Sequence, residues 1–232
     1  MFEFSNAHHF RKTVAGFCMI AAPMLLLAGA IVHPGRHTEE AALIAQAAAN
    51  PDAWYIAHLM ILMGVVLMVP AVLGLMHMLR EREVAWGHLG GGLAMLGLLA
   101  LTAAVTVVGF VAWQAAAVGT GATELFERLN ETTGFVLPVY IVSFGFAVGM
   151  VMLAVGLMRA HVAQSWHALF IAAGTVALAI GGVTASVVLD VAGAAVLLVG
   201  LGSVGRRVLA ETDSEWEHTP EVEDFRALPG MR

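Results

Sequence analysis

A single acidic side chain, Asp190, interrupts an apolar stretch that runs from position 166 to position 204. A carboxylate in such surroundings is costly unless it is paired, so we expect it to face other polar groups inside a bundle of helices. Four polar residues near the matching ends of other apolar segments are candidate neighbours: His58, Tyr140, His33 and Gln114. Such a cluster can bind a ligand or metal, or exchange a proton. The alternative is an interhelical hydrogen bond that only fixes packing, typically worth about 1 kcal/mol or less.

A second set of candidates consists of histidines beside short basic stretches, namely His88, His167 and His77. A neutral imidazole ligates iron, copper or zinc. His88 and His167 each begin an apolar segment at a similar depth, so haem b or a transition metal held between them is one interpretation. The alternative, which the sequence favours, is that these histidines lie beside lipid headgroups together with Trp86 and Trp166.

The composition indicates the elements that must position these residues. Of the 232 residues, 59% are hydrophobic and 12% are charged, and the mean hydropathy is +0.84. Soluble domains usually carry about 25% charged residues. The apolar runs are continuous rather than alternating and reach the roughly 20 residues that a membrane helix needs. The sequence therefore predicts an all-α, polytopic membrane bundle in contact with the lipid bilayer. The lone Cys18 provides no disulfide framework.

Six membrane spans are predicted within a transmembrane region of residues 1–207, and residues 208–232 form an acidic tail. The spans cover residues 13–32, 54–79, 84–113, 135–158, 165–181 and 183–204. The turn between the last two is placed at Gly181 and Gly182, because paired glycines weaken a helix. Short helices are predicted in two of the loops, at residues 38–51 and 123–130.

The distribution of positive charge predicts the orientation. Seven basic residues lie near span ends on one side, and only Arg36 and Arg128 lie in the opposite loops. The seven are Arg11, Lys12, Arg80, Arg82, Arg159, Arg206 and Arg207. Because cytoplasmic loops carry an excess of Lys and Arg, both termini are expected in the cytoplasm, with the bacterial plasma membrane as the expected location. We expect the first span to be an uncleaved anchor, although its small-residue end also resembles a signal-peptide cleavage site.

Two stretches of the sequence are similar to each other. Positions 74–88 read GLMHMLREREVAWGH, and positions 156–167 read GLMRAHVAQSWH. Both fall at predicted cytoplasmic turns, which join spans two and three and spans four and five. This similarity suggests a parallel repeat of a helical hairpin, a kind of internal symmetry that is common in membrane proteins.

The helix number and two histidine positions resemble the transmembrane ascorbate-dependent b-type cytochromes. In that family, two haems lie between spans two and four and between spans three and five. Here span three has His88 and span five has His167, and span two has His58. Span four, however, has Tyr140 and no histidine, so one of the two ligand pairs is incomplete. The sequence is therefore not assigned to that family.

The hypothesis that the sequence favours is a non-enzymatic binding, accessory or complex subunit. The sequence has no phosphate loop, catalytic triad or metalloprotease motif. Seven acidic residues in the tail can attract a basic protein partner, and this acidic excess argues against nucleic acid. They are Glu211, Asp213, Glu215, Glu217, Glu221, Glu223 and Asp224. The alternatives are a haem- or metal-binding redox protein that uses the histidines, and a small-solute or proton-coupled permease that uses Asp190 and His58.

Overall fold

The computed structural model describes residues 7–118, 124, 128, 131 and 133–217, and the elements of this part are all helical. Six helices are long and apolar enough to cross a membrane. They are α1 (Ala7–Val32), α3 (Pro51–Met78), a continuous helix Val84–Val118, α7 (Thr133–Arg159, whose candidate span is Ile141–Arg159), α8 (Ser165–Thr184) and α9 (Val187–Ala210). The continuous helix consists of α4 (Val84–Thr106), the π-helical turn η1 (Val107–Val111) and α5 (Ala112–Val118). The prediction of an all-helical fold with six helices of spanning length is confirmed for the described residues, and these helices support an integral membrane location.

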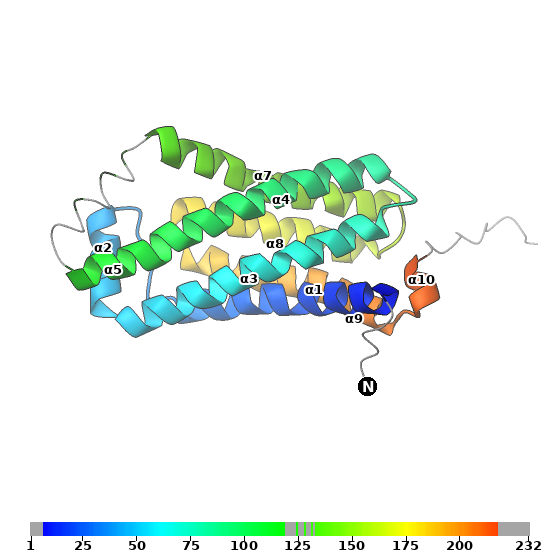
Figure 1. Ribbon diagram of the computed structural model, residues 1–232, viewed down its shortest axis with the longest axis horizontal. Coiled ribbons are helices and arrows are strands. Elements are labelled where there is room, and N and C mark those ends of the chain that lie inside the picture. Colours follow the sequence, from blue (N-terminus) through cyan, green and yellow to red (C-terminus); the bar gives the residue numbers. More distant parts are fainter. Residues whose placement is uncertain (1–6, 119–123, 125–127, 129–130, 132, 218–232) are drawn as a thin grey trace, which may run out of the picture.

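The six spans lie roughly side by side along the long axis of the molecule (Figure 1). Each span packs against the spans that precede and follow it in the chain, and α9 packs against α1, which closes the ring. Glycines allow the closest approaches. A Cβ at Gly97 of α4 would clash with the Phe146 backbone of α7, and one at Gly174 of α8 would clash with the Leu197 backbone of α9. Small residues at such crossings let helix backbones come together in a membrane.

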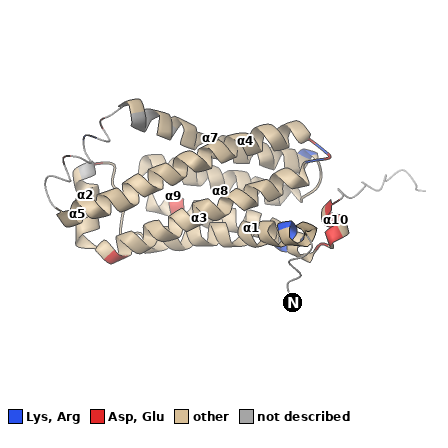
Figure 2. Cartoon of the chain, viewed as in Figure 1, with Lys and Arg blue, Asp and Glu red and all other residues tan. Residues whose placement is uncertain are grey.

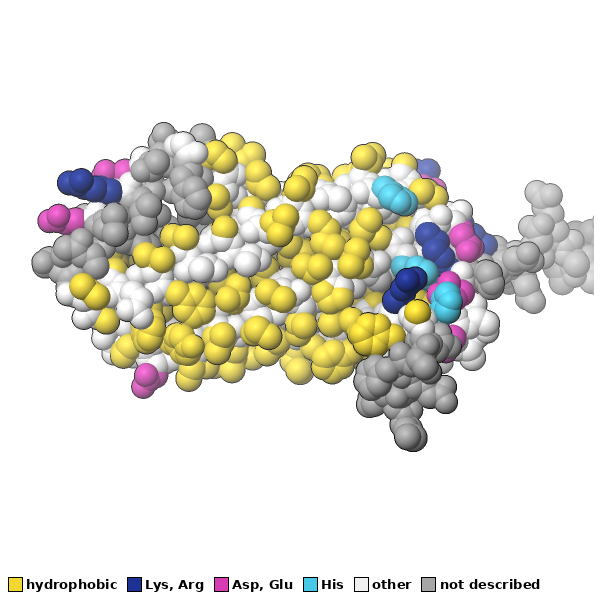
Figure 3. Space-filling view, in the orientation of Figure 1, with side chains coloured by type: hydrophobic (Ala, Val, Ile, Leu, Met, Phe, Trp, Pro, Cys, Tyr) yellow, Lys and Arg dark blue, Asp and Glu magenta, His cyan; other side chains and the backbone are white. Residues whose placement is uncertain are grey.

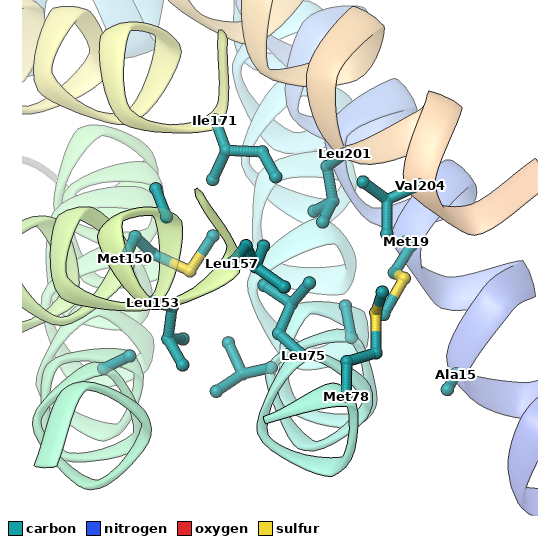
Figure 4. Packing of buried hydrophobic residues seen from close by; sticks show 14 of the residues in the cluster. Ala15, Met19, Leu75, Met78, Met150, Leu153, Leu157, Ile171, Leu201 and Val204 are labelled. Carbon is teal, nitrogen blue, oxygen red and sulfur yellow. The ribbon is translucent and has the colours of Figure 1, made fainter. Parts of the chain in front are cut away.

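Apolar side chains fill the space that the ring encloses. Met150, Leu153 and Leu157 of α7 lie in one buried cluster with Ile171 of α8 and Leu201 of α9. Figure 4 shows these side chains pointing toward one another between the helices. Within the described residues, the interior of the ring is therefore a packed apolar core.

The face of the molecule shown in Figure 3 carries many apolar side chains between its two ends. Large hydrophobic side chains of the spans, such as Phe17, Leu99, Ile141 and Leu169, are well exposed. The charged residues are concentrated toward the two ends, and few lie along the helices between them (Figure 2). An apolar belt with charged ends matches the bilayer, because its hydrocarbon region excludes unpaired charges.

A short helix lies at each end of the ring. Helix α2 (Glu40–Ala49) packs against α5 and α3 at one end, and α10 (Asp213–Glu217) packs against α1 at the other (Figure 1). Helix α2 matches the helix predicted at residues 38–51, although its N-cap is Glu39 and not Thr38. The second predicted loop helix, at residues 123–130, lies largely outside the described residues.

The predicted turn at Gly181 and Gly182 is wrong. Helix α8 continues through both glycines to Thr184, and Ala185 ends it with a φ of +51°. The turn comes later because the Ser186 side chain accepts a hydrogen bond from the Leu189 amide (3.4 Å) and so caps α9. As a result α9 spans Val187–Ala210 instead of residues 183–204, and Asp190 lies in its first turn.

Other helix ends also differ from the predicted spans. The first span begins at Ala7, and the third extends to Val118, past the expected end at position 113. In both cases the helix continues beyond the most apolar residues, because helical hydrogen bonding does not stop where hydropathy falls. The orientation in the membrane and the parallel repeat stay predictions.

Candidate functional site beneath helix α2

The buried carboxylate of Asp190 is paired with an arginine from the linker between α1 and α2. Asp190 is 3% exposed, and its Oδ2 lies 2.7 Å from Nε of Arg36. Its place in the first turn of α9 adds a second favourable interaction, because the N-terminus of a helix attracts negative charge. Oδ2 has no well-directed hydrogen bond from the described residues, so we regard the contact as a charge pair. The buried carboxylate is therefore neutralised by a cation, and not by a histidine.

The linker reaches Asp190 because of its sequence, His33-Pro34-Gly35-Arg36. Gly35 has a φ of +150°, which favours glycine over residues with a side chain. The Pro34 carbonyl accepts a hydrogen bond from Nε2 of Gln46 on α2 (2.7 Å), and the Gly35 amide donates to Nδ1 of His33 (3.3 Å). These bonds hold the linker folded beneath α2.

Next to the linker, three aromatic rings pack together. The His33 ring centroid lies 5.0 Å from those of both Trp54 and His58, and the Trp54 and His58 centroids are 4.6 Å apart. Trp54 and His58 are almost completely buried on α3. We call His33, Arg36, Trp54, His58 and Asp190 the α2-end cluster. It joins residues of α3, α9 and the linker after α1.

Hydrogen bonds determine which nitrogen of each imidazole carries the proton. Nδ1 of His58 donates to the Trp54 carbonyl (2.9 Å), which leaves Nε2 of His58 as an acceptor. Nδ1 of His33 accepts from Gly35, so its proton is on Nε2. Burial, together with the positive charge of Arg36, lowers the pKa of His33 to about 3 from the ordinary value of 6.5. His33 is thus neutral at pH 7.

A π-helical turn lies directly beside this cluster. Nε1 of Trp54 donates to the Gly109 carbonyl within η1 (2.8 Å). A Cβ at Gly109 would lie 2.5 Å from Cδ2 of His58, so glycine is needed for the close approach of the ring. Single π-helical turns are frequent at functional sites, and this one shapes the α4–α5 side of the cluster.

Of the five residues predicted for this site, the structure brings together three: Asp190, His58 and His33. Gln114 is exposed on α5 and lies outside the cluster. Tyr140 belongs to α7, but its side chain lies outside the described part of the chain. Arg36 and Trp54 were not among the predicted site residues. A buried carboxylate requires a cation, and Arg36 is one of only two basic residues in the loops on this side, so this signal was present in the sequence.

At the opposite end, the first part of the acidic tail folds onto the bundle. Nζ of Lys12, which is nearly buried, lies 2.6 Å from Oδ1 of Asp213 and donates to the Glu211 carbonyl (2.7 Å). The Trp216 ring stacks on His77, with centroids 4.5 Å apart, and the Trp216 carbonyl accepts hydrogen bonds from Nε2 of His77 and Nη2 of Arg80 (3.0 Å each). His77 is therefore engaged with α10.

The other two histidines proposed as haem or metal ligands lie on helices that are not neighbours in the ring. His88 is exposed at the start of α4, where its Nδ1 donates to the Val84 carbonyl (3.0 Å). His167 is buried at the start of α8, and its Nδ1 has no partner within the described residues. Helix α7 lies between α4 and α8 in the ring. Among the described residues, no group of three or more His, Cys, Asp or Glu side chains is placed to hold a metal ion.

Comparison with known proteins adds no functional assignment. No protein-family model matches the chain, and no curated protein and no solved structure is significantly similar to it.

Proposed function

We propose that this integral membrane protein is a non-enzymatic binding or accessory subunit that acts through the two ends of its helical ring. The observation that carries this proposal is the separation of polar and apolar groups. Buried apolar side chains occupy the ring interior, whereas the organised polar contacts lie at the α2 end and the α10 end. A protein built in this way presents recognition groups at its ends.

We further propose that the α10 end faces the cytoplasm of a bacterial cell. The support is the charge bias, because the seven basic residues near span ends lie at this end of the helices, with Arg36 at the other end. Fusion of a reporter enzyme that is active only outside the plasma membrane, placed after position 217, should give no signal. The same reporter inserted between Thr38 and Glu39 should be active.

The proposed partner is a basic protein that binds the tail beyond α10. Four of the seven acidic residues of the tail already have partners within the chain: Glu211 pairs with Arg207, Asp213 with Lys12, Glu217 with His8, and Glu215 accepts hydrogen bonds from Thr212. The remaining three, Glu221, Glu223 and Asp224, lie outside the described residues. Residues 218–232, which carry these three acidic side chains, are therefore the segment that we propose to test for partner binding.

Deletion of residues 218–232 tests this assignment without disturbing α10. Proteins that co-purify with the tagged protein in mild detergent are quantified against full-length protein and against the triple variant Glu221→Gln, Glu223→Gln, Asp224→Asn. A basic partner should be lost from both altered proteins, and their melting temperatures should equal that of the full-length protein. Equal recovery of every co-purifying protein from all three samples contradicts the proposal.

A proton-coupled permease for a small solute is the second candidate function. It is favoured by one observation, the charge pair between Asp190 and Arg36 at the edge of the membrane region, beside His58. Charged residues within spans often belong to substrate or proton pathways. In proteoliposomes, an imposed pH gradient should then drive solute uptake that Asp190→Asn abolishes. Uptake that is unchanged in this variant rejects a transport role for Asp190.

A further inference from the structure

We propose that the linker of residues 33–36 is an acid-operated latch, in which His33 accepts a proton, the linker releases Asp190, and helix α2 detaches from the bundle. The proposal goes beyond the binding role proposed above and does not depend on it.

The linker is placed to act as a latch because it connects four helices. It continues directly from α1, and its Pro34 carbonyl is held by Gln46 of α2. Arg36 pairs with Asp190 of α9, and the His33 ring packs on Trp54 and His58 of α3. Loss of the folded linker would therefore remove attachments to α2, α3 and α9 together.

His33 is the residue through which acid can open the linker. In the closed state its Nδ1 accepts a hydrogen bond from the Gly35 amide. An imidazolium carries a proton on both nitrogens, so it can no longer accept this bond, and two N–H groups would face each other. Protonation of His33 therefore breaks the contact that folds the linker.

The charges around His33 oppose its protonation. The titratable groups that face it are Arg36 and His37 on its own linker and His58 on α3. None of them carries a negative charge that could pair with an imidazolium. The nearest opposite charge in the cluster is Asp190 of α9, which is already paired with Arg36. An imidazolium at position 33 would thus be repelled by its neighbours.

The direction of the pH effect follows from the two states of His33. The pKa of His33 is about 3 in the closed linker and near 6.5 once the ring is hydrated. Between pH 3 and pH 6.5, His33 is protonated in the released linker but neutral in the closed linker. The closed state is therefore fully stable above pH 6.5 and loses stability as the pH falls toward 3. Between pH 7 and pH 5 the ratio of released to closed protein should increase roughly 20-fold.

Thiol labelling of α2 in the detergent-purified full-length chain measures this release. In a Cys18→Ala background, Ile44→Cys places a thiol on the buried face of α2, where Ile44 packs in one cluster with Trp54 and Ala115. Ala45→Cys places a thiol on the exposed face of the same helix and serves as the matched control. The ratio of the two labelling rates cancels the effect of pH on the thiol reagent.

We expect this ratio to rise roughly 20-fold from pH 7 to pH 5. In a His33→Gln background the rise should disappear, because glutamine accepts the Gly35 bond but takes up no proton, whereas His37→Gln should keep it. Asp190→Asn should raise the ratio at both pH values. A ratio that does not change with pH in the protein with His33 overturns the proposal without any need for the variants. A rise that persists in His33→Gln also overturns it.

Discussion

Arg36, in the linker after α1, lies with its Nε 2.7 Å from Oδ2 of Asp190, in the first turn of α9. Helices α1 and α9 are the first and last spans, and they pack against each other where the ring closes. The charge pair therefore links the first and last spans at the α2 end of the molecule. The two residues differ in burial, so substitutions of Arg36 and of Asp190 should differ in their effect on stability.

Arg36→Gln should destabilise the protein more than Asp190→Asn. Removal of the arginine leaves a buried carboxylate without a counter-charge, which costs roughly 3 kcal/mol. Removal of the carboxylate leaves an arginine whose side chain is 29% exposed and can be hydrated. Thermal unfolding in detergent compares the two variants, and the double variant should be more stable than Arg36→Gln alone. An equal or larger loss in Asp190→Asn would show that the carboxylate is not held by this pair.

Gly181→Ala should destabilise the protein, and the neighbouring Gly182→Ala should not. A Cβ at Gly181 would lie 2.5 Å from Oδ1 of Asp190, and such overpacking typically costs about 1–3 kcal/mol. A Cβ at Gly182 would meet nothing within 4 Å, so this variant should only gain helix propensity, up to about 1 kcal/mol. Melting temperatures of the two single variants provide the measurement. Similar values for both would mean that α8 and α9 do not approach each other closely at Asp190.

Trp216→Ala should detach α10 from the bundle. Trp216 is 4% exposed and stacks on His77, and loss of a large buried aromatic side chain costs roughly 3 kcal/mol. Hydrogen exchange should become fast at residues 213–217 and at the start of α1, while the centres of the spans keep their protection. Protection of α10 that survives the substitution would mean that Trp216 does not anchor it.

Acid should weaken the contact between α10 and α1 through Asp213. The hydrogen bond from Lys12, followed by that from His9, holds the pKa of Asp213 below its ordinary value of 3.8. Because the folded pKa is lowered, this contribution is complete above pH 3.8 and is lost as the pH falls through the lower folded value. The protection of α10 amides, measured as exchange relative to the intrinsic rate at the same pH, should therefore fall below pH 4, and Asp213→Asn should show the lower protection already at pH 6. Identical pH profiles for both proteins would exclude this role for Asp213.

The separation of His88 and His167 predicts that these two residues do not hold a haem together. His88 is exposed on α4, and α7 lies between its helix and that of His167. Absorption spectra of the purified protein, before and after reduction with dithionite, should therefore show no Soret band that depends on this pair. A Soret band that shifts on reduction and disappears in both His88→Ala and His167→Ala would contradict this prediction.

Local sequence was sufficient to predict the approximate positions of the spans. A run of about 20 apolar residues can be recognised without knowing which helices pack against it. Helix α2 was also predictable, because the Asn50-Pro51 stop and the acidic first turn are local signals. The same holds for the need of Asp190 to find a polar partner, which follows from the cost of burying any carboxylate.

The tertiary structure decided which residues meet. The choice of Arg36 over Tyr140 or Gln114 depends on the path of the linker through Gly35 and on the rotation of α9, and neither is set by hydropathy. The separation of His88 from His167 depends on the order of helices around the ring, and the docking of Trp216 depends on a chain reversal after α9. Gly181 does not form the turn but provides space for Asp190 of the neighbouring helix α9. Hydropathy and capping act between residues close in sequence, whereas these contacts join residues far apart in the chain, so only the folded arrangement determines them.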